Sequence, residues 1–483
     1  MEQVHENRKT APLWIAALVV AALSAWICYD AIPGVNWGIW TAAAAAGLLL
    51  LASHRAGPGS PVALLAATAT VLAAGASVTA NELMLVLILL STTLLLAIAM
   101  LLATAPSLKR LTAGFVMLAP LAAFATAIVS AFARFGEATR LVRSPRARAA
   151  VRGVAITLPV LIVFALLLAV ADPTFAQWRN AVENLLTSWD FLPRTAFFVI
   201  MLGITIGAYS HAATGIEHEA KVPQEQRRWL GSGERLILLA GVTGLLWLFI
   251  AVQLSYLFGN LPRITGSGIT FAEYARRGFG ELTTVSFATA LLIIASERYG
   301  ERDHRAGITR ALTLALIVAV VLILGSAFYR VILYENAYGF TIARLYGQAF
   351  MIVVAIAVGT MTLEVLGELD TGRLFRRVFA AALLVLISLI YWNHEAWIAD
   401  RNIDRFAATG KLDTGYLTRE LSLDAVPAIV DGIARLPEPV RSELRGALTK
   451  RYLNRAEIFE RDWFEANISR TRARAALKPL GLP

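Results

Sequence analysis

The chain has 483 residues, of which 57% are hydrophobic and only 16% are charged, and its mean hydropathy is +0.63. Soluble domains are roughly 45–50% apolar and about 25% charged, so this composition excludes a single water-soluble domain and indicates that much of the chain lies in a lipid bilayer. It also excludes disordered, fibrous and disulfide-rich secreted proteins. The one cysteine, Cys28, provides neither a disulfide nor a cysteine metal site.

Twelve apolar stretches are long enough to cross a bilayer, and each must be a helix because backbone groups in hydrocarbon have to be satisfied within their own segment. They lie near residues 11–29, 36–53, 60–79, 82–104, 111–133, 152–171, 191–212, 234–258, 280–296, 310–333, 342–366 and 375–392. The first follows Arg8 and Lys9 and is longer than the apolar core of a signal peptide, so we interpret it as a retained span. The sequence therefore predicts an all-α, polytopic transmembrane bundle.

The side of each loop is predicted from its basic residues, because loops rich in lysine and arginine stay in the cytoplasm. Basic residues gather in segment 134–152 and in the loops that contain Lys221, Arg298 and Arg373. With these segments inside, the outward-facing parts are loops 172–190, 259–279 and 334–341 and the chain after residue 393. The net charge of +10 then reflects topology, and nucleic acid is not expected as a partner.

The early stretches are less consistent with this scheme, because five of them precede the basic segment at residue 134 while the N-terminal tail carries Arg8 and Lys9. If the tail is inside, one early stretch must be re-entrant or two must fuse. If the tail is outside, all twelve stretches span. The sequence therefore leaves eleven or twelve spans open.

Residues 393–483 change composition abruptly, with 15 Lys+Arg and 13 Asp+Glu and with apolar residues at helical spacing. They predict a small soluble helical domain, either an interaction module or a cap on the membrane domain. Helices are expected from about Asp424, after Pro437 or Pro439, and from about Ile458. The expected division is into N-terminal transmembrane segments, a basic cytoplasmic loop, a second transmembrane domain and an extracytoplasmic helical domain, at residues 1–133, 134–151, 152–392 and 393–483.

Charged and aromatic residues of the outward loops form the candidate binding cluster, since the predicted topology places them at one membrane level. They are Asp172, Arg194, Tyr274, Arg276, Arg277, Glu281, Arg330, Glu335 and Tyr338. The segment 271–282 is either an interfacial helix with headgroup-facing arginines or the lip of an anion or substrate site. Arg330 is expected to pair with Glu335 or to extend toward the outer interface.

Signatures of catalysis and ion coupling are missing from the sequence. The six histidines show no His-Glu-x-x-His spacing, and the glycine pairs lack the lysine of a phosphate-binding loop. No catalytic residue, metal site or cofactor is therefore predicted. Ionisable residues are nearly absent from the middle of the spans, which argues against a proton-driven pump, and Glu364 lies near the cytoplasmic end of its stretch.

Three parts of the chain resemble bacterial membrane proteins grouped as domains of unknown function 4153 and 4173. The similar runs are Val252–Gly259 continuing into Tyr274–Phe279, Leu333–Gly339, and the pair Ala399–Asn402 and Ser469–Arg474. The similarity covers roughly residues 150–480, with Asn260-Leu261 as a departure in the loop after Gly259. The resemblance implies a bacterial cytoplasmic-membrane protein, and it carries over no catalytic residue.

We therefore expect a multi-pass inner-membrane protein, a binding component of the cell envelope rather than an enzyme. Its partners would be the lipid bilayer and an envelope protein that contacts residues 393–483. Two alternatives remain open. A transporter of a small or lipid-linked solute predicts a water-filled cavity that reaches the bilayer midplane. An outer-face enzyme predicts Glu281 or Glu335 exposed in a pocket beside Arg276 or Arg277, whereas sealed charge pairs favour the binding role.

Overall fold

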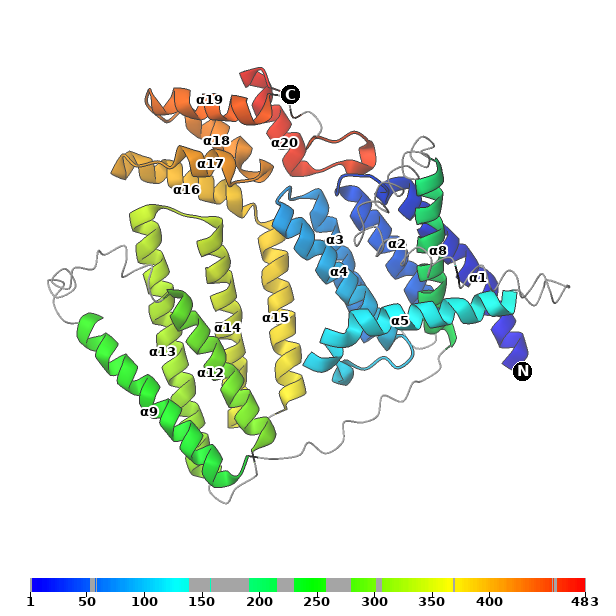
Figure 1. Ribbon diagram of the computed structural model, residues 1–483, viewed down its shortest axis with the longest axis horizontal. Helices are drawn as coiled ribbons and strands as arrows, with labels where there is room; N and C mark the ends of the chain where they lie inside the picture. Colours follow the sequence, from blue (N-terminus) through cyan, green and yellow to red (C-terminus); the bar gives the residue numbers. More distant parts are fainter. Residues whose placement is uncertain are drawn as a thin grey trace, which may run out of the picture. The chain divides into compact units, whose positions relative to one another are not determined.

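The structure, a computed structural model, describes residues 2–52, 57, 59–138, 157, 191–214, 230–257, 279–300, 306–367, 370–453, 455 and 458–482. The regular elements of these residues are helices, beside one isolated bridge between Leu230 and Gly300 (Figure 1). Nine described helices are long and apolar enough to cross a membrane. The all-α bundle predicted from the sequence is thus confirmed, and the chain is a multi-pass membrane protein.

Polar side chains cap several of the helices that the apolar stretches predict. Asn81 precedes α4 (Glu82–Leu102), and its side chain accepts the N–H of Met84 at 2.9 Å. Ser60 caps α3 (Pro61–Ala74) in the same way. Such caps satisfy backbone donors that the first helical turn leaves open. The predicted stretch 152–171 lies outside the described residues, apart from Thr157.

The chain forms two compact units. Unit 1 consists of Met1–Arg110, Gly114–His218 and Phe459–Ser469. Its helices are α1 (Glu2–Leu23), α2 (Val35–Ala52), α3, α4, α5 (Ala113–Ala138) and α8 (Phe191–Thr214). Helix α8 packs along α1 and α2, where the Tyr209 hydroxyl donates to the carbonyl of Ala44 at 3.0 Å. Helix α3 packs along α4.

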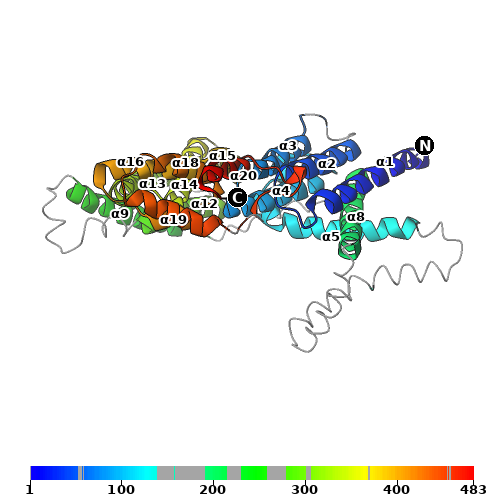
Figure 2. The ribbon, with the colours of Figure 1, turned by 90° about the horizontal axis from the view of Figure 1, so that it is seen from above.

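Helix α5 has a different direction from its neighbours in unit 1. Both views of the ribbon show α5 running across α8 rather than along it (Figures 1 and 2). At the crossing, a Cβ atom on Gly207 of α8 would lie closer than 3.0 Å to the carbonyl oxygen of Ala127 of α5. Only glycine permits this backbone-to-backbone approach.

The segment 459–469 packs on unit 1 at the turns that follow α1 and α3. Glu465 accepts the N–H of Ile32 at 3.0 Å, and the Asn467 amide donates to the carbonyls of Ala76 at 2.8 Å and Thr79 at 2.9 Å. The expected helix from about Ile458 is therefore wrong within the described residues. These side chains bind distant backbone groups, so only the short turn Trp463–Glu465 precedes α20 (Ile468–Leu477).

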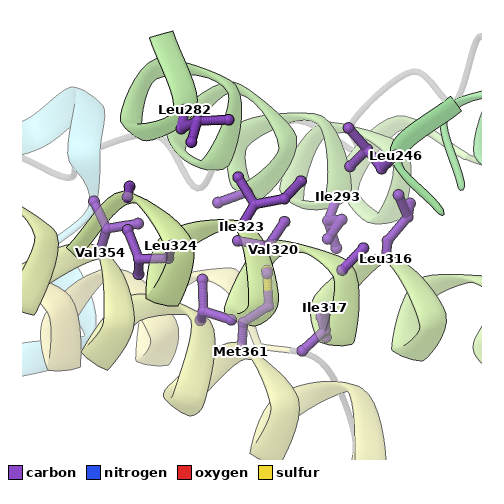
Figure 3. Close-up of a cluster of buried hydrophobic side chains, with 14 of the residues drawn as sticks. Leu246, Leu282, Ile293, Leu316, Ile317, Val320, Ile323, Leu324, Val354 and Met361 are labelled. Carbon is purple, nitrogen blue, oxygen red and sulfur yellow. The ribbon is translucent and has the colours of Figure 1, made fainter. Parts of the chain in front are cut away.

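Unit 2 consists of Leu111–Ala113, Glu219–Ile458 and Arg470–Pro483. Its long helices are α9 (Ser232–Leu257), α12 (Phe279–Tyr299), α13 (Ala306–Tyr338), α14 (Ile342–Leu366) and α15 (Thr371–Tyr391). Aliphatic side chains from these helices form one core, with α13 at its centre (Figure 3). Leu316, Val320 and Ile323 of α13 are almost fully buried there.

Short amphipathic helices follow α15 in unit 2 and lie at one end of α13 and α14 (Figure 1). They are α16 (His394–Thr409), α17 (Thr414–Arg419), α18 (Val426–Ile433) and α19 (Val440–Tyr452). Pro427 occupies the first turn of α18, and Leu444, Leu448 and Tyr452 are buried on α19, as the sequence predicts. These four helices are referred to below as the helical domain.

Candidate functional site

The clearest polar constellation in unit 2 is the contact between the α13–α14 turn and the helical domain. The side-chain amide of Asn402, on α16, pairs with both backbone groups of Phe340 in the turn. Its Nδ2 donates to the Phe340 carbonyl at 2.8 Å, and its Oδ1 accepts the Phe340 N–H at 2.8 Å. Asn402 is only 9% exposed, so water hardly competes for these bonds. This contact, made by residues 336–342 with α16 and α17, is called the joint.

Two arginines donate hydrogen bonds to backbone carbonyls at the C-terminal end of α13. Arg405 of α16 donates through Nε to the Asn336 carbonyl at 2.9 Å and through Nη2 to the Ala337 carbonyl. Arg344 of α14 donates to the carbonyl of Gly339. The last carbonyls of a helix have no intrahelical donor and carry the negative end of the helix dipole, so guanidinium groups stabilise this end.

The N-terminal end of α14 is held from the other side of the joint. The N–H of Ile342 donates to the hydroxyl of Tyr416, on α17, at 2.7 Å. Burial raises the pKa of Tyr416 to about 12, and the bond from Ile342 opposes this rise only in part. The hydroxyl therefore stays protonated, and its hydrogen remains available for a further acceptor. The hydroxyl oxygen of Tyr346, on α14, also lies 3.1 Å from Nε2 of His394, at the start of α16.

Glu335 lies in the last turn of α13, directly beneath the joint. Its side chain accepts a hydrogen bond from Nε2 of Gln348 at 2.7 Å, and Arg344 supplies a nearby positive charge. The guanidinium of Arg344 also lies 4.1 Å from the centre of the Tyr334 ring. Glu335 is 5% exposed, so its carboxylate is closed off by these neighbours.

The sequence-predicted site residues do not all meet at this place. Arg330, Glu335 and Tyr338 lie together in the last turns of α13; Arg330 and Glu335 are buried, and Tyr338 is 54% exposed. Glu281 is exposed in the first turn of α12. Arg194 belongs to unit 1, where its guanidinium lies 5.6 Å from the ring centre of Tyr29. The residues outside the described ranges are Asp172, Tyr274, Arg276 and Arg277.

The arrangement is suited to holding two parts of unit 2 together. A general acid or base must reach the proton that it transfers, and Glu335 is enclosed by Gln348 and Arg344 instead. The residues that the sequence interpretation missed are Asn402, Arg405, Tyr416 and Gln348. Asn402 and Gly339 each end one of the runs that resemble a known family, which was the available indication. Arg405 and Tyr416 have no such indication, because they lie outside the similar runs.

Comparison with known proteins identifies a family whose matched region includes the joint. A family model with the description "Domain of unknown function (DUF4153)" matches residues 64–432, which includes the α13–α14 turn and helices α16 and α17. No curated protein and no solved structure matches the chain. The family match covers well over half of the chain, and the chain therefore belongs to the DUF4153 family.

Proposed function

We propose that the protein is a non-enzymatic component of the bacterial cell envelope. In this proposal the helical bundle lies in the inner membrane and holds the helical domain on the outer face, where the domain binds a partner protein or a lipid. The observation that carries the proposal is the joint, in which Asn402, Arg405 and Tyr416 satisfy the backbone of the α13–α14 turn. Such bonds fix the position and orientation of a domain.

The charges at the opposite end of the α14–α15 hairpin support the outward position of the joint. There, the buried carboxylate of Glu364 accepts two bonds from Arg373, at 2.7 and 2.6 Å, and one from Arg377 at 2.7 Å. Arg310 also donates to the carbonyl of Leu366 at this end. An arginine-rich helix end belongs on the cytoplasmic side, which leaves the joint and the helical domain outside.

The state of Glu335 favours binding over catalysis at the joint. Catalysis at the joint would need the carboxylate of Glu335 to reach a substrate, whereas Glu335 is 5% exposed and bonded to Gln348. The bond from Gln348 and the nearby charge of Arg344 support a binding role. The proposal therefore assigns Glu335 to the support of the α13–α14 turn.

The test is a double variant, N402A/R405A, that removes the side-chain bonds of the joint while the transmembrane core is untouched. A photo-crosslinking residue replaces Arg445, an exposed position on α19, in otherwise unchanged cells. We expect a defined adduct in the parent protein, whose mass identifies a protein or a lipid, and at least a several-fold loss of it in N402A/R405A. Hydrogen exchange should show α16 loosened and α13 still protected.

The matched control is R435A, which removes an exposed guanidinium of the helical domain that pairs with Asp400 and Asp404 of α16 and not with the α13–α14 turn. Exposed pairs of this kind contribute roughly 0–1 kcal/mol, so R435A should keep the adduct. A second variant, E335Q, separates binding from chemistry. If E335Q abolishes a cellular activity that N402A/R405A retains, the joint is not the functional feature and the proposal fails.

A further inference from the structure

We infer that helix α5 does not cross the bilayer: it lies in the cytoplasmic leaflet with its exposed face among the acyl chains, and the chain crosses the membrane eleven times. The exposed face of α5 is an interaction surface for lipid that is separate from the joint. Contacts within unit 1 and the distribution of basic residues support this position.

One end of unit 1 is identified by contacts between distant segments. The segment 459–469 binds the turn after α1 through Ile32 and the turn after α3 through Ala76 and Thr79. Helix α8 begins at the same end, because the ring centres of Phe197 and Tyr29 are 5.6 Å apart. These four parts of the chain therefore share one side of the membrane.

The path of the chain then limits the number of crossings. Helix α1 runs toward this end, α2 runs away from it, α3 returns, and α4 leaves it again over 21 residues, a rise of about 31 Å. Residues 103–112 consequently lie at the opposite end, while α8 starts at the first end. The part of the chain between α4 and α8 must therefore cross the membrane an odd number of times. It contains two apolar stretches, 111–133 and 152–171. Only one of these stretches can cross.

The direction of α5 shows which stretch stays on one side. Because α5 runs across α8 (Figures 1 and 2), its two ends lie at similar depth in unit 1. The two helices touch at Gly207 and Ala127. Gly207 is seven residues before the end of α8 at Thr214, which is about 10 Å along the helix axis. The single crossing is then assigned to the stretch 152–171, which lies outside the described residues apart from Thr157.

This depth explains why α5 is apolar on both faces. A helix at headgroup level has one strongly polar face. On α5, the face toward the protein carries small buried residues such as Ala123 and Ala127, and the opposite face exposes Met117 at 82%, Leu121 at 70% and Val129 at 68%. About 10 Å inside the end of α8, that exposed face meets acyl chains rather than water.

The basic residues at both ends of α5 also place the helix in the cytoplasmic leaflet. Lys109 and Arg110 precede the helix, and Arg134 in its last turns begins a segment that carries five further arginines by residue 152. Long basic side chains near a helix end reach anionic headgroups while their stems remain in hydrocarbon. If α5 crossed, Lys109 and Arg110 would lie opposite the arginines of 134–152, against the distribution that sets topology. With α5 in the leaflet, Arg8, Lys9 and all these residues are cytoplasmic.

The first experiment uses single cysteines in a C28A background of the full chain, labelled with a membrane-impermeant maleimide in spheroplasts and in inside-out vesicles. S107C, before α5, and S144C, after it, should both be labelled only in inside-out vesicles. D462C, at an exposed position of segment 459–469, should be labelled only in spheroplasts. Labelling of S107C and S144C from opposite sides would overturn the inference.

The second experiment measures depth and does not depend on the labelled loops. Nitroxide labels at M117C and V129C, both on the exposed face of α5, should report the same depth in a bilayer of anionic and neutral phospholipid. A spanning helix would separate them by about 18 Å, because each residue rises 1.5 Å, and a difference of that size would disprove the leaflet position. I237C and L248C form the matched control pair, since Ile237 and Leu248 are exposed at 75% and 63% on α9 and should differ by about 16 Å.

Discussion

Gly339 and Asn402 fit against each other so closely that a Cβ atom on the glycine would lie under 3.0 Å from Oδ1 of the asparagine. The glycine also has a φ of +86°, a backbone conformation that residues with a Cβ atom rarely adopt. Both facts arise at the turn where α13 ends and α14 begins. The tight turn brings the backbone of Phe340 to the Asn402 amide, so the conformation of the glycine and the joint depend on each other.

The variant G339A should loosen the joint. The added methyl group clashes with Asn402 and strains the backbone, and we expect a loss of about 1–3 kcal/mol in the free energy of unfolding. Hydrogen exchange at Phe340 and along α16 measures the effect. The control is G325A, within α13, where a Cβ meets nothing within 4 Å. Alanine suits a helix interior better than glycine by about 0.5–1 kcal/mol, so equal destabilisation by both variants would contradict the prediction.

Removal of the Tyr416 hydroxyl should weaken the start of α14. In Y416F the N–H of Ile342 loses its acceptor in a partly buried place, which costs about 1–3 kcal/mol. Thermal unfolding of the detergent-solubilised protein provides the measurement, and Y338F, at a side chain that is 54% exposed, is the control. Because the folded pKa of Tyr416 is raised to about 12, its stabilising effect is complete below pH 10 and decreases as the pH rises from about 10 toward 12. Y416F should lose this alkaline decline.

Acid should release segment 459–469 from the turns of unit 1 that follow α1 and α3. Burial acts to raise the pKa of Glu465, but the N–H groups of Arg461 and Ile32 and the Arg461 guanidinium outweigh burial and hold the pKa below its usual range. A carboxylate with a lowered folded pKa stabilises the folded state above its unfolded pKa of about 4.3, and the stabilisation is lost as the pH falls through the folded value.

We therefore expect faster hydrogen exchange in residues 459–469 below about pH 4. E465Q should exchange faster already at pH 7 and show a smaller change on acidification. D462N, at the exposed neighbour Asp462, should behave like the parent protein. A transition that is equally large in E465Q would show that another group controls the release.

The carboxylate of Glu364 should stabilise the end of unit 2 where α14 meets α15. In E364Q the new amide nitrogen faces the guanidinium donors of Arg373 and Arg377, and charge-assisted bonds of this kind contribute about 1.5–3 kcal/mol. Chemical unfolding should register a loss in that range. The control, R376A, removes only a 3.9 Å pair with the exposed Asp370 and should change stability by less than about 1 kcal/mol.

The hydropathy of the sequence was sufficient to predict where the long apolar helices of the described residues lie. The stretch 342–366 coincides with α14, and the stretch 82–104 differs from α4 by two residues at one end. The direction of α5 was not predictable in this way, because hydropathy reports the length and apolarity of a segment, and α5 has the composition of a span. Where α5 crosses α8, Gly207 meets Ala127, a contact between residues 80 positions apart.

The candidate site was predictable only at its charged residues. Glu335 and Arg330 were identified because ionisable groups near a span are unusual, and the structure buries both in the last turns of α13. The polar residues of the joint itself were missed, since an asparagine or a tyrosine in a soluble helix does not indicate which backbone group it will bind. Asn402 meets Phe340, 62 residues earlier in the chain. Glu465 and Asn467 were missed for the same reason.

The course of segment 459–469 has a practical consequence for genetic dissection of this protein. The chain leaves unit 2 at Ile458, contributes eleven residues to unit 1, and returns to unit 2 at Arg470. Each unit is therefore discontinuous in sequence, and no single cut separates them. A stop codon after residue 458 would take Glu465 and Asn467 from one unit and α20 from the other, so a null phenotype of such a truncation would say nothing about the role of the C-terminal helices themselves.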